Sequence, residues 1–303
     1  MIRFKDNLIK IFSFISIFIV ISTIFLIFSF IFYNGVSGIN LKFLTENPKG
    51  MPLGVEGGIN NAIIGSFLLM ILSMFFSTLL GICFAIYNKI FCKSKIVKTF
   101  LSFLIQCISS IPSIIIGLFV YGFFIVTLNI PKSLFTASIA LSLMVFPFVE
   151  LNVEKLIEEF DKTCIRDSYS LGIDKIYMCR KLILPIISNK ILSISILAGS
   201  YAIGATAPLL LTGVVFMAKP SGLLKPIMAL PFHLHMLLSQ SVATEKAYAT
   251  AMVLIGVLIV LNLLSEIIMR NIGGKIVEYI RNKNVIIYLS TVFKKINKFF
   301  SKK

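Results

Sequence analysis

Residues 11–33, IFSFISIFIVISTIFLIFSFIFY, form a run of twenty-three residues without one charged side chain. About 20 consecutive apolar residues are enough for a helix to cross a hydrocarbon core about 30 Å thick. The run exceeds the roughly 7–15-residue apolar region of a secretory signal peptide, and no A-x-A cleavage site follows it. We therefore expect it to be a retained membrane-spanning helix.

The rest of the chain has the same character. Hydrophobic residues make up 57% of the 303 residues, and charged residues 14%, against about 25% in soluble domains. Mean hydropathy is +0.97. These values predict an all-α polytopic membrane protein with six transmembrane helices. The expected spans are 11–33, 62–87, 100–127, 134–152, 186–213 and 249–269.

Basic residues alternate between the connections of these spans. The N-terminus, residues 88–99, residues 153–190 and the chain after 269 hold 23 of the 29 lysines and arginines. Because basic connections stay on the cytoplasmic side, both termini are predicted to be cytoplasmic. The same rule explains the net charge of +16 without a nucleic-acid partner. The basic tail 271–303 is typical of either an interfacial helix on anionic lipid or a frayed end.

Ionisable residues are missing from the centres of the expected spans, and Glu150 and Glu266 come closest. Secondary carriers and membrane enzymes with buried acid–base chemistry need such groups, so both classes are disfavoured. The chain has no G-x-x-x-x-G-K-[ST] phosphate loop, and a partner must supply energy for uphill transport. No cofactor is expected. His233 and His235 lie in an expected external loop with little support for a metal site.

Two spans contain clusters of small polar residues and proline. The motifs are SSIPSIIIGLF at 109–119 and AIGATAPLLLTG at 202–213. Proline frees backbone carbonyls that protein or a watery cavity must satisfy, whereas glycine and serine also allow close helix packing. These residues could therefore line a translocation path or serve close helix packing, and both interpretations remain open. The candidate path residues are Ser109, Ser110, Pro112, Ser113, Gly117, Tyr201, Gly204, Thr206 and Pro208.

A polar segment, RDSYSLGIDKIYMCRKLILP at 166–185, interrupts the apolar pattern. Gly172 suits the left-handed residue that ends a helix, and Asp174 suits the N-cap of the next one. The segment is therefore predicted to be a cytoplasmic helix–turn–helix. Apolar residues around it, such as Ile165, Tyr169 and Leu171, need cover. Neighbouring helices, the lipid interface or a docked protein would each supply that cover.

The spacing G-x9-L-x-L-P, formed by Gly172, Leu182, Leu184 and Pro185, resembles the C-terminal half of the EAA loop of ABC importer permeases. The two membrane motifs resemble those of phosphate importer permeases of the PstA type. The resemblance covers about residues 55–270 and implies the type I ABC permease fold. It also implies an ATPase-coupling loop that comprises Ile165, Arg166, Asp167, Ser168, Tyr169, Leu171, Gly172, Leu184 and Pro185.

The resemblance further implies a permease subunit, not an enzyme, of an ATP-driven phosphate importer in the bacterial inner membrane. The implied partners are a homologous permease in a heterodimer, two ATPase subunits and an extracytoplasmic phosphate-binding protein. The implied domains are an anchor at 1–54, a transport domain at 55–270 with a coupling loop at 153–190, and the tail at 271–303.

The chain departs from the family pattern at two places. Residues 166–168 are Arg-Asp-Ser where the family has Glu-Ala-Ala, and Tyr201 and Ala205 replace a family Arg and Glu. These departures keep two alternatives open: a regulatory or transport-impaired paralogue, and a permease for another oxyanion. A secondary carrier is a third alternative, which the uncharged spans make less favoured.

Overall fold

The structure is a computed structural model that describes residues 2–50, 54, 56–159, 168, 170–241 and 243–282. The chain divides into two compact units. Unit 1 comprises Met1–Ser73, Ile111–Met144 and Tyr201–Ile259, and unit 2 comprises Met74–Ser110, Val145–Ser200 and Val260–Lys303. Four helices contribute residues to both units, because the divisions at 73, 144, 200 and 259 fall inside them.

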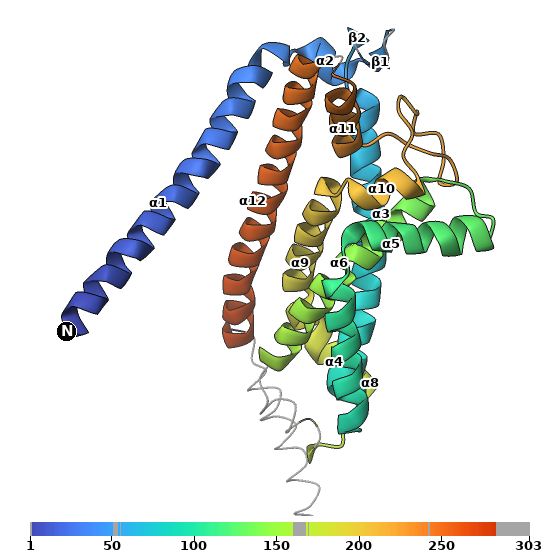
Figure 1. The fold of residues 1–303 in the computed structure, drawn as a ribbon. Coiled ribbons are helices and arrows are strands. Elements are labelled where there is room, and N and C mark those ends of the chain that lie inside the picture. The colour runs from blue at the N-terminus through green and yellow to red at the C-terminus, as the bar shows by residue number, and fades with distance from the viewer. Residues whose placement is uncertain are drawn as a thin grey trace, which may run out of the picture. The chain divides into compact units, whose positions relative to one another are not determined.

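Long apolar helices dominate the described part of the chain (Figure 1). Five of them are long and apolar enough to cross a membrane, and a bent pair makes six. The all-α polytopic prediction is thereby confirmed. The five are α1 (Ile2–Gly35), α3 (Asn60–Ile86) with the π turn η2 (Tyr87–Phe91), α6 (Leu134–Glu159), α8–η4–α9 (Lys175–Met178, Cys179–Ile183 and Leu184–Gly204), and α12 (Thr244–Asn282).

The third expected span, 100–127, is not one straight helix. It consists of α4 (Lys95–Ser110), α5 (Ser113–Val120) and the π segment η3 (Tyr121–Thr127), and it bends by 100° at the break. Pro112 lies at that break. Because proline lacks an N–H and disfavours helical geometry in the residue before it, the helix ends there.

The fifth expected span, 186–213, is also too long as predicted. α9 ends at Gly204, and a separate short helix, α10, runs over Ala207–Thr212. Pro208 lies in the first turn of α10, where a missing N–H costs no helical hydrogen bond. The prolines in both motifs therefore break the spans and start new helices.

Short elements that the sequence did not predict complete unit 1. They are η1 (Val36–Gly38), α2 (Leu41–Thr45), the antiparallel pair β1 (Pro48–Lys49) and β2 (Glu56–Gly57), and α11 (Leu230–Gln240). Asn40 caps α2, because its side chain accepts a hydrogen bond from Phe43 N at 2.8 Å. His233 and His235 lie on α11, so the expectation of a loop there is wrong.

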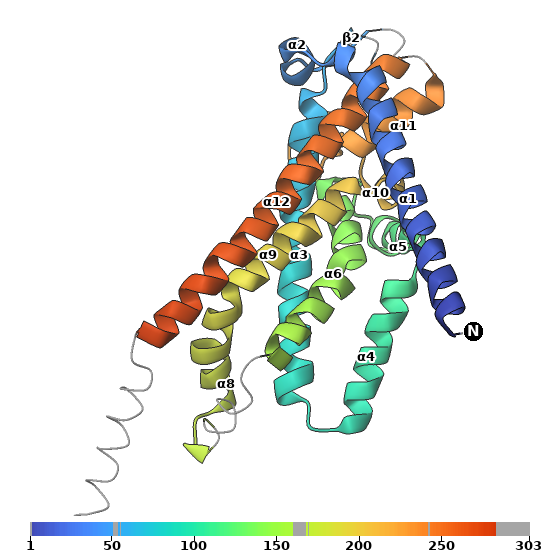
Figure 2. The same cartoon turned by 90° about the vertical axis from the view of Figure 1, so that its left-hand side faces the viewer.

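α1 contacts its own unit mainly at its C-terminal end. A Cβ atom on Gly35 would lie 2.7 Å from the backbone oxygen of Tyr248 in α12, and Phe30 meets the Tyr248 ring edge-on at 5.5 Å. Figure 2 shows α1 beside the N-terminal part of α12. The apolar window of α1 is 0% buried by the rest of the chain. The apolar side chains of α1 therefore suit contact with lipid tails, because they need no polar partner.

Close backbone contacts at glycine hold unit 1 together. A Cβ atom on Gly65 in α3 would lie 2.0 Å from the carbonyl oxygen of Met228. One residue on, Ser66 Oγ accepts a hydrogen bond from Leu230 N at 2.8 Å. Small residues that let backbones approach are the usual means of helix packing in membranes.

Unit 2 uses paired hydroxyls instead. Ser193 and Ser265 join α9 to α12, since each side chain donates to the other's backbone carbonyl, at 2.7 and 2.9 Å. Thr78 Oγ1 donates to Ser195 Oγ at 2.8 Å and joins α3 to α9. Such bonds between helices contribute roughly 1 kcal/mol each in a membrane.

We predict that Gly65→Val destabilises the protein by about 2–3 kcal/mol, because a side chain there overlaps the Met228 carbonyl. Gly256→Val in α12 is the matched control, since no atom lies within 4 Å of a Cβ at that position. Thermal unfolding in detergent, followed by gel filtration, measures both variants. Equal melting temperatures for the two would contradict the assigned contact.

Candidate functional site

The two predicted path motifs meet in unit 1. A Cβ atom on Gly117 of α5 would lie 2.7 Å from Pro208 Cα of α10 and 3.1 Å from its carbonyl oxygen. Both residues are buried. Figures 1 and 2 show α5 and α10 side by side. The structure therefore brings together two segments that lie some 90 residues apart in the sequence.

The two motifs that make this contact also carry uncharged polar groups. Pro112 is the N-cap of α5 and Thr206 that of α10, and neither provides a side-chain capping bond. Ser113 and Thr206 are half-buried, whereas Gly204 and Tyr201 are exposed, Tyr201 by 59%. No atom lies within 4 Å of a Cβ on Gly204. These two motifs therefore offer hydroxyls and backbone N–H groups, which can donate hydrogen bonds to an anion.

Two of the predicted path residues belong to the other unit. Ser109 and Ser110 lie at the end of α4, in unit 2, and both side chains donate to the Gln106 carbonyl at 2.8 Å. Local bonds of this kind satisfy serine hydroxyls within their own helix. Seven of the nine path residues thus belong to unit 1, and Ser109 and Ser110 belong to unit 2.

The C-terminal end of α10 is anchored by residues that the sequence analysis missed. Thr136 Oγ1 in α6 donates to the Thr212 carbonyl at 2.7 Å, and Ser133 N donates to the same carbonyl at 3.3 Å. A Cβ on Gly213 would lie 2.0 Å from the Ser133 oxygen. These bonds fix α10 where its own helical bonding ends. Hydroxyl residues at ordinary spacing carry no sequence signal for such a role.

His233 and His235 differ in their exposure to solvent. His233 is 1% exposed, its Nδ1 lies 3.0 Å from Thr250 Oγ1, and its ring stacks on Phe216 with centroids 5.7 Å apart. His235 is exposed. No group of three or more potential ligands that could hold a metal occurs among the described residues. His233 is therefore a packing residue within unit 1.

Burial lowers the pKa of His233 to about 4, and the charge of Lys246 adds to this effect. The imidazole is therefore neutral in the folded protein at pH 7. The neutral ring nitrogen of His233 either donates a hydrogen bond to Thr250 or accepts one from it, depending on which ring nitrogen carries the proton.

The predicted coupling segment is described only in part. The residues Ile165, Arg166, Asp167 and Tyr169 lie outside the described ranges. Ser168 is buried, and its carbonyl accepts from Ile173 N at 3.0 Å. Gly172 has φ +70°, as expected for a helix-ending residue, and Asp174 caps α8 by accepting from Ile176 N at 3.0 Å.

Exposed apolar side chains lie on both sides of Gly172. Leu171 is 41% exposed, Ile176 63% and Tyr177 57%. Ile176 and Tyr177 were missed in the sequence analysis, although each is an apolar residue within a polar segment. Further along, Leu184 is half-buried and Pro185 exposed. Large exposed apolar residues of this kind are typical of a surface that another protein or lipid covers.

One carboxyl side chain is more buried than the sequence suggested. Glu150 of α6 is 1% exposed, and neither of its oxygens has a hydrogen-bond partner. It lies in unit 2, whereas the α5–α10 contact lies in unit 1. The absence of ionisable groups predicted for the span centres therefore holds for the motifs at 109–119 and 202–213, but α6 does bury an acid.

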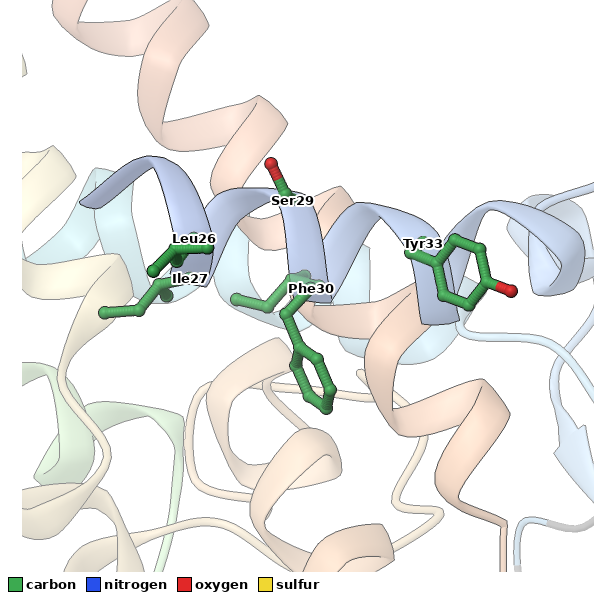
Figure 3. A pocket seen from close by; sticks show the side chains of 6 residues that line it. Leu26, Ile27, Ser29, Phe30 and Tyr33 are labelled. Carbon is green, nitrogen blue, oxygen red and sulfur yellow. The ribbon is translucent and has the colours of Figure 1, made fainter. Parts of the chain in front are cut away.

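A hollow on α1 is unsuitable for an anion. It is lined by Leu26, Ile27, Ser29, Phe30, Ile31 and Tyr33, which all come from this one helix (Figure 3). Figure 3 shows the Ser29 hydroxyl pointing away from Leu26, Ile27 and Phe30. An apolar hollow offers no partner for a charge, so a charged solute would lose its hydration there without compensation.

These features define the class of protein, and comparison with known proteins defines the family. Residues 77–278 match the family of binding-protein-dependent transport system inner membrane components. The match covers about two thirds of the chain, and the protein belongs to this family. It is therefore a multi-pass inner-membrane component of a transport system that includes a binding protein, and not an enzyme.

The curated relatives include phosphate transport proteins. The phosphate transport system permease protein PstA of Yersinia pestis is 30% identical over 77% of this chain and 79% of its own length. The PstA protein of Mycobacterium leprae is 27% identical over 69% of each chain. A probable PstA from Methanocaldococcus jannaschii is 29% identical over 66% of this chain and 72% of its own.

The fold is that of ABC type I permeases. A chain from inward-facing structures of the MetNI methionine ABC transporter matches with a TM-score of 0.57, over 69% of this chain and 95% of that one. A second crystal form of that transporter matches with a TM-score of 0.54. At 16% and 15% identity these likenesses concern the fold alone.

We predict that acidification destabilises unit 1 through His233. The unfolded histidine binds protons below about pH 6.5, whereas the folded one stays neutral down to about pH 4. Its contribution to stability is therefore complete above pH 6.5 and decreases as the pH falls toward 4, by on the order of 3 kcal/mol.

The measurement is the melting temperature between pH 7 and pH 4.5 for the native protein, His233→Gln and, as a control, His235→Gln. The difference between native and His233→Gln should change with pH, while the exposed His235 variant follows the native curve. A pH-independent difference for His233→Gln would contradict the assignment.

Proposed function

We propose that the protein is the transmembrane permease subunit of an ATP-driven phosphate importer. The observation that carries the proposal is the packing of α5 on α10 through Gly117 and Pro208. These helices contain the two motifs that resemble phosphate importer permeases. The relatives named PstA, over two thirds or more of their lengths, support phosphate as the substrate.

The proposed path uses neutral donors. Ser113, Gly204, Thr206 and Tyr201 offer hydroxyl and backbone N–H groups around the α5–α10 contact, with Pro112 breaking the third span. Tyr201 and Ala205 replace the charged pair of the family, so charge for phosphate comes from the partner permease or is not needed. Ser109 and Ser110 remain proposed path residues at the end of α4. An anion held by neutral donors leaves more readily than one paired with arginine.

The proposed assembly contains a homologous permease as heterodimer partner, two ATPase subunits and an extracytoplasmic phosphate-binding protein. Both termini lie in the cytoplasm, with 1–54 as anchor, 55–270 as the transport domain and 271–303 as a basic cytoplasmic tail. The segment 153–190 docks on an ATPase subunit, and Leu171, Ile176 and Tyr177 provide its apolar contacts. Residues 166–168 meet an ATPase cleft that accepts Arg-Asp-Ser.

The mechanism is alternating access. ATP binding draws the ATPase subunits together, and the docked segment transmits this movement to α6 and α9, which flank it in the chain. Each state must contact phosphate or the binding protein differently, because coupling is a difference in interaction free energy between states.

The direct test is phosphate uptake into proteoliposomes that contain the complete transport system. Uptake should require ATP, this subunit and the binding protein, and excess sulfate or molybdate should not compete. ATP-dependent uptake that persists without this subunit would instead identify a regulatory paralogue. Uptake that is inhibited equally by another oxyanion would identify a broader anion permease.

We predict that Gly117→Val lowers phosphate uptake about tenfold, because a side chain there forces α5 away from Pro208. Overpacking of this kind costs about 1–3 kcal/mol, and 1.4 kcal/mol corresponds to a factor of ten. Gly122→Val in η3 is the matched control, since nothing lies within 4 Å of a Cβ there. Equal uptake by both variants would remove the support that this contact gives to the path.

We also predict that Gly172→Pro abolishes co-purification of the ATPase subunit while the permease still inserts and assembles. Proline cannot adopt the φ of +70° that the turn requires, so the apolar residues on either side are redirected. Gly172→Asn, which tolerates left-handed geometry, should retain association. Unchanged pull-down of the ATPase by Gly172→Pro would refute the docking role.

A further inference from the structure

The two ends of the proposed coupling loop are tied to one short element in unit 2. Within the proposed coupling segment 153–190, α6 ends at Glu159 and α8 begins at Lys175, so these two helices flank the loop at 160–174. Both are bonded to η2 (Tyr87–Phe91), the π turn that ends α3. The sequence gives no hint of this, because η2 lies about 70 residues before the loop.

The bond to α6 is an ionic cluster around Lys89. Its Nζ lies 2.5 Å from Oε1 of Glu154 and 2.5 Å from Oε1 of Glu158. The two glutamates are four residues apart, so they lie on the same face of α6. Asn88 Nδ2 also donates to Glu154 Oε1, at 3.4 Å.

Burial distinguishes the two contacts. The side chain of Glu154 is 13% exposed and that of Lys89 is 25% exposed, whereas Glu158 is 56% exposed. An exposed ion pair contributes little, but removing one partner of a shielded pair leaves a charge without compensation. Lys89 and Glu154 therefore form the important contact, and Glu158 adds a weaker one.

The bond to α8 comes from the other side of the loop. Lys175 Nζ donates to the carbonyl oxygen of Ile90, at 3.1 Å. Ile90 is in the last turn of η2, where helix carbonyls lack partners further along the helix. A lysine that donates to such a carbonyl stabilises the end of the helix. One five-residue turn thus contacts the helix before the loop and the helix after it.

The form of η2 suits an element that changes shape. A π turn holds one more residue per hydrogen-bonded turn than an α-helix, and such turns are frequent at functional sites. Its position at the end of α3 links any displacement directly to a membrane-length helix.

We propose that Lys89 is a positioning residue for energy coupling: it holds α6 on the η2 turn that also binds α8, and so transmits movement of the loop to α3. This inference rests on the proposed coupling role of the loop. Without Lys89, the loop still docks on the ATPase, but its ionic link to η2 through α6 is lost and α3 follows its movement less closely, through the bonds from Lys175 and Asn88 alone. ATP hydrolysis then continues with less phosphate moved per ATP.

The experiment measures phosphate taken up per ATP hydrolysed in proteoliposomes with the complete transport system. The variants are Lys89→Gln, Lys89→Arg and, as a matched control, Lys93→Gln, an exposed lysine four residues further on. Lys89→Gln should lower the ratio about three- to tenfold, within the range that residues of a coupling network produce. Lys89→Arg, which keeps the charge, and Lys93→Gln should keep the native ratio.

Two further variants keep the test decisive if Lys89→Gln is poorly folded. Glu158→Gln removes a carboxylate from a mostly exposed side chain, and it should lower the ratio by a smaller factor with normal assembly. The charge exchange Lys89→Glu with Glu154→Lys should recover part of the ratio that Lys89→Glu alone loses.

The outcomes separate this inference from the proposed function. A native ratio in both Lys89→Gln and Glu158→Gln, with ATP-driven uptake intact, overturns the positioning role alone. A native system that does not take up phosphate, or whose loop does not bind the ATPase, overturns the proposed function on which it rests. A merely structural lysine would lower the amount of assembled complex but not the phosphate moved per ATP.

Discussion

The backbone's need for hydrogen-bond partners in hydrocarbon is the constraint on which the rest of the structure depends. Each unpaired N–H or C=O in lipid costs several kcal/mol, so spans are helical wherever lipid surrounds them. α1, whose apolar window is 0% buried by the rest of the chain, is regular over its whole length. Where the described chain leaves helical geometry around α10, other protein atoms bond its backbone.

The segment around α10 shows how backbone N–H and C=O groups find hydrogen-bond partners outside a regular helix. Thr136 Oγ1 and Ser133 N donate to the Thr212 carbonyl, and Ser66 Oγ accepts from Leu230 N. Glycines at 65, 117 and 213 let the backbones come close enough for these contacts. Broken helices can then expose hydroxyls and N–H groups, and this is what the proposed path requires.

Polar groups in unit 2 have a different role. Ser193 with Ser265 and Thr78 with Ser195 join membrane helices through uncharged bonds, whereas charged residues gather around η2. Charged contacts are therefore concentrated where the chain enters and leaves the proposed coupling loop. A connection of this kind can carry a mechanical signal, because it has discrete bonded and unbonded arrangements.

The class of protein, its all-α polytopic fold and the family were predictable from the sequence. Long uncharged runs such as 11–33 permit only membrane helices, and the motifs at 109–119 and 202–213 resemble one family. The turn at Gly172 and the cap at Asp174 were also predictable, because they depend on local backbone geometry. The prolines at 112 and 208 indicated interrupted spans, but the 100° bend and the end of α9 at Gly204 were not predictable, since they depend on the tertiary contacts that satisfy the freed backbone groups. Tertiary structure alone decided that Gly117 meets Pro208 and that Lys89 meets Glu154, because contacts between distant segments depend on how helices pack and leave no periodic signal in the sequence.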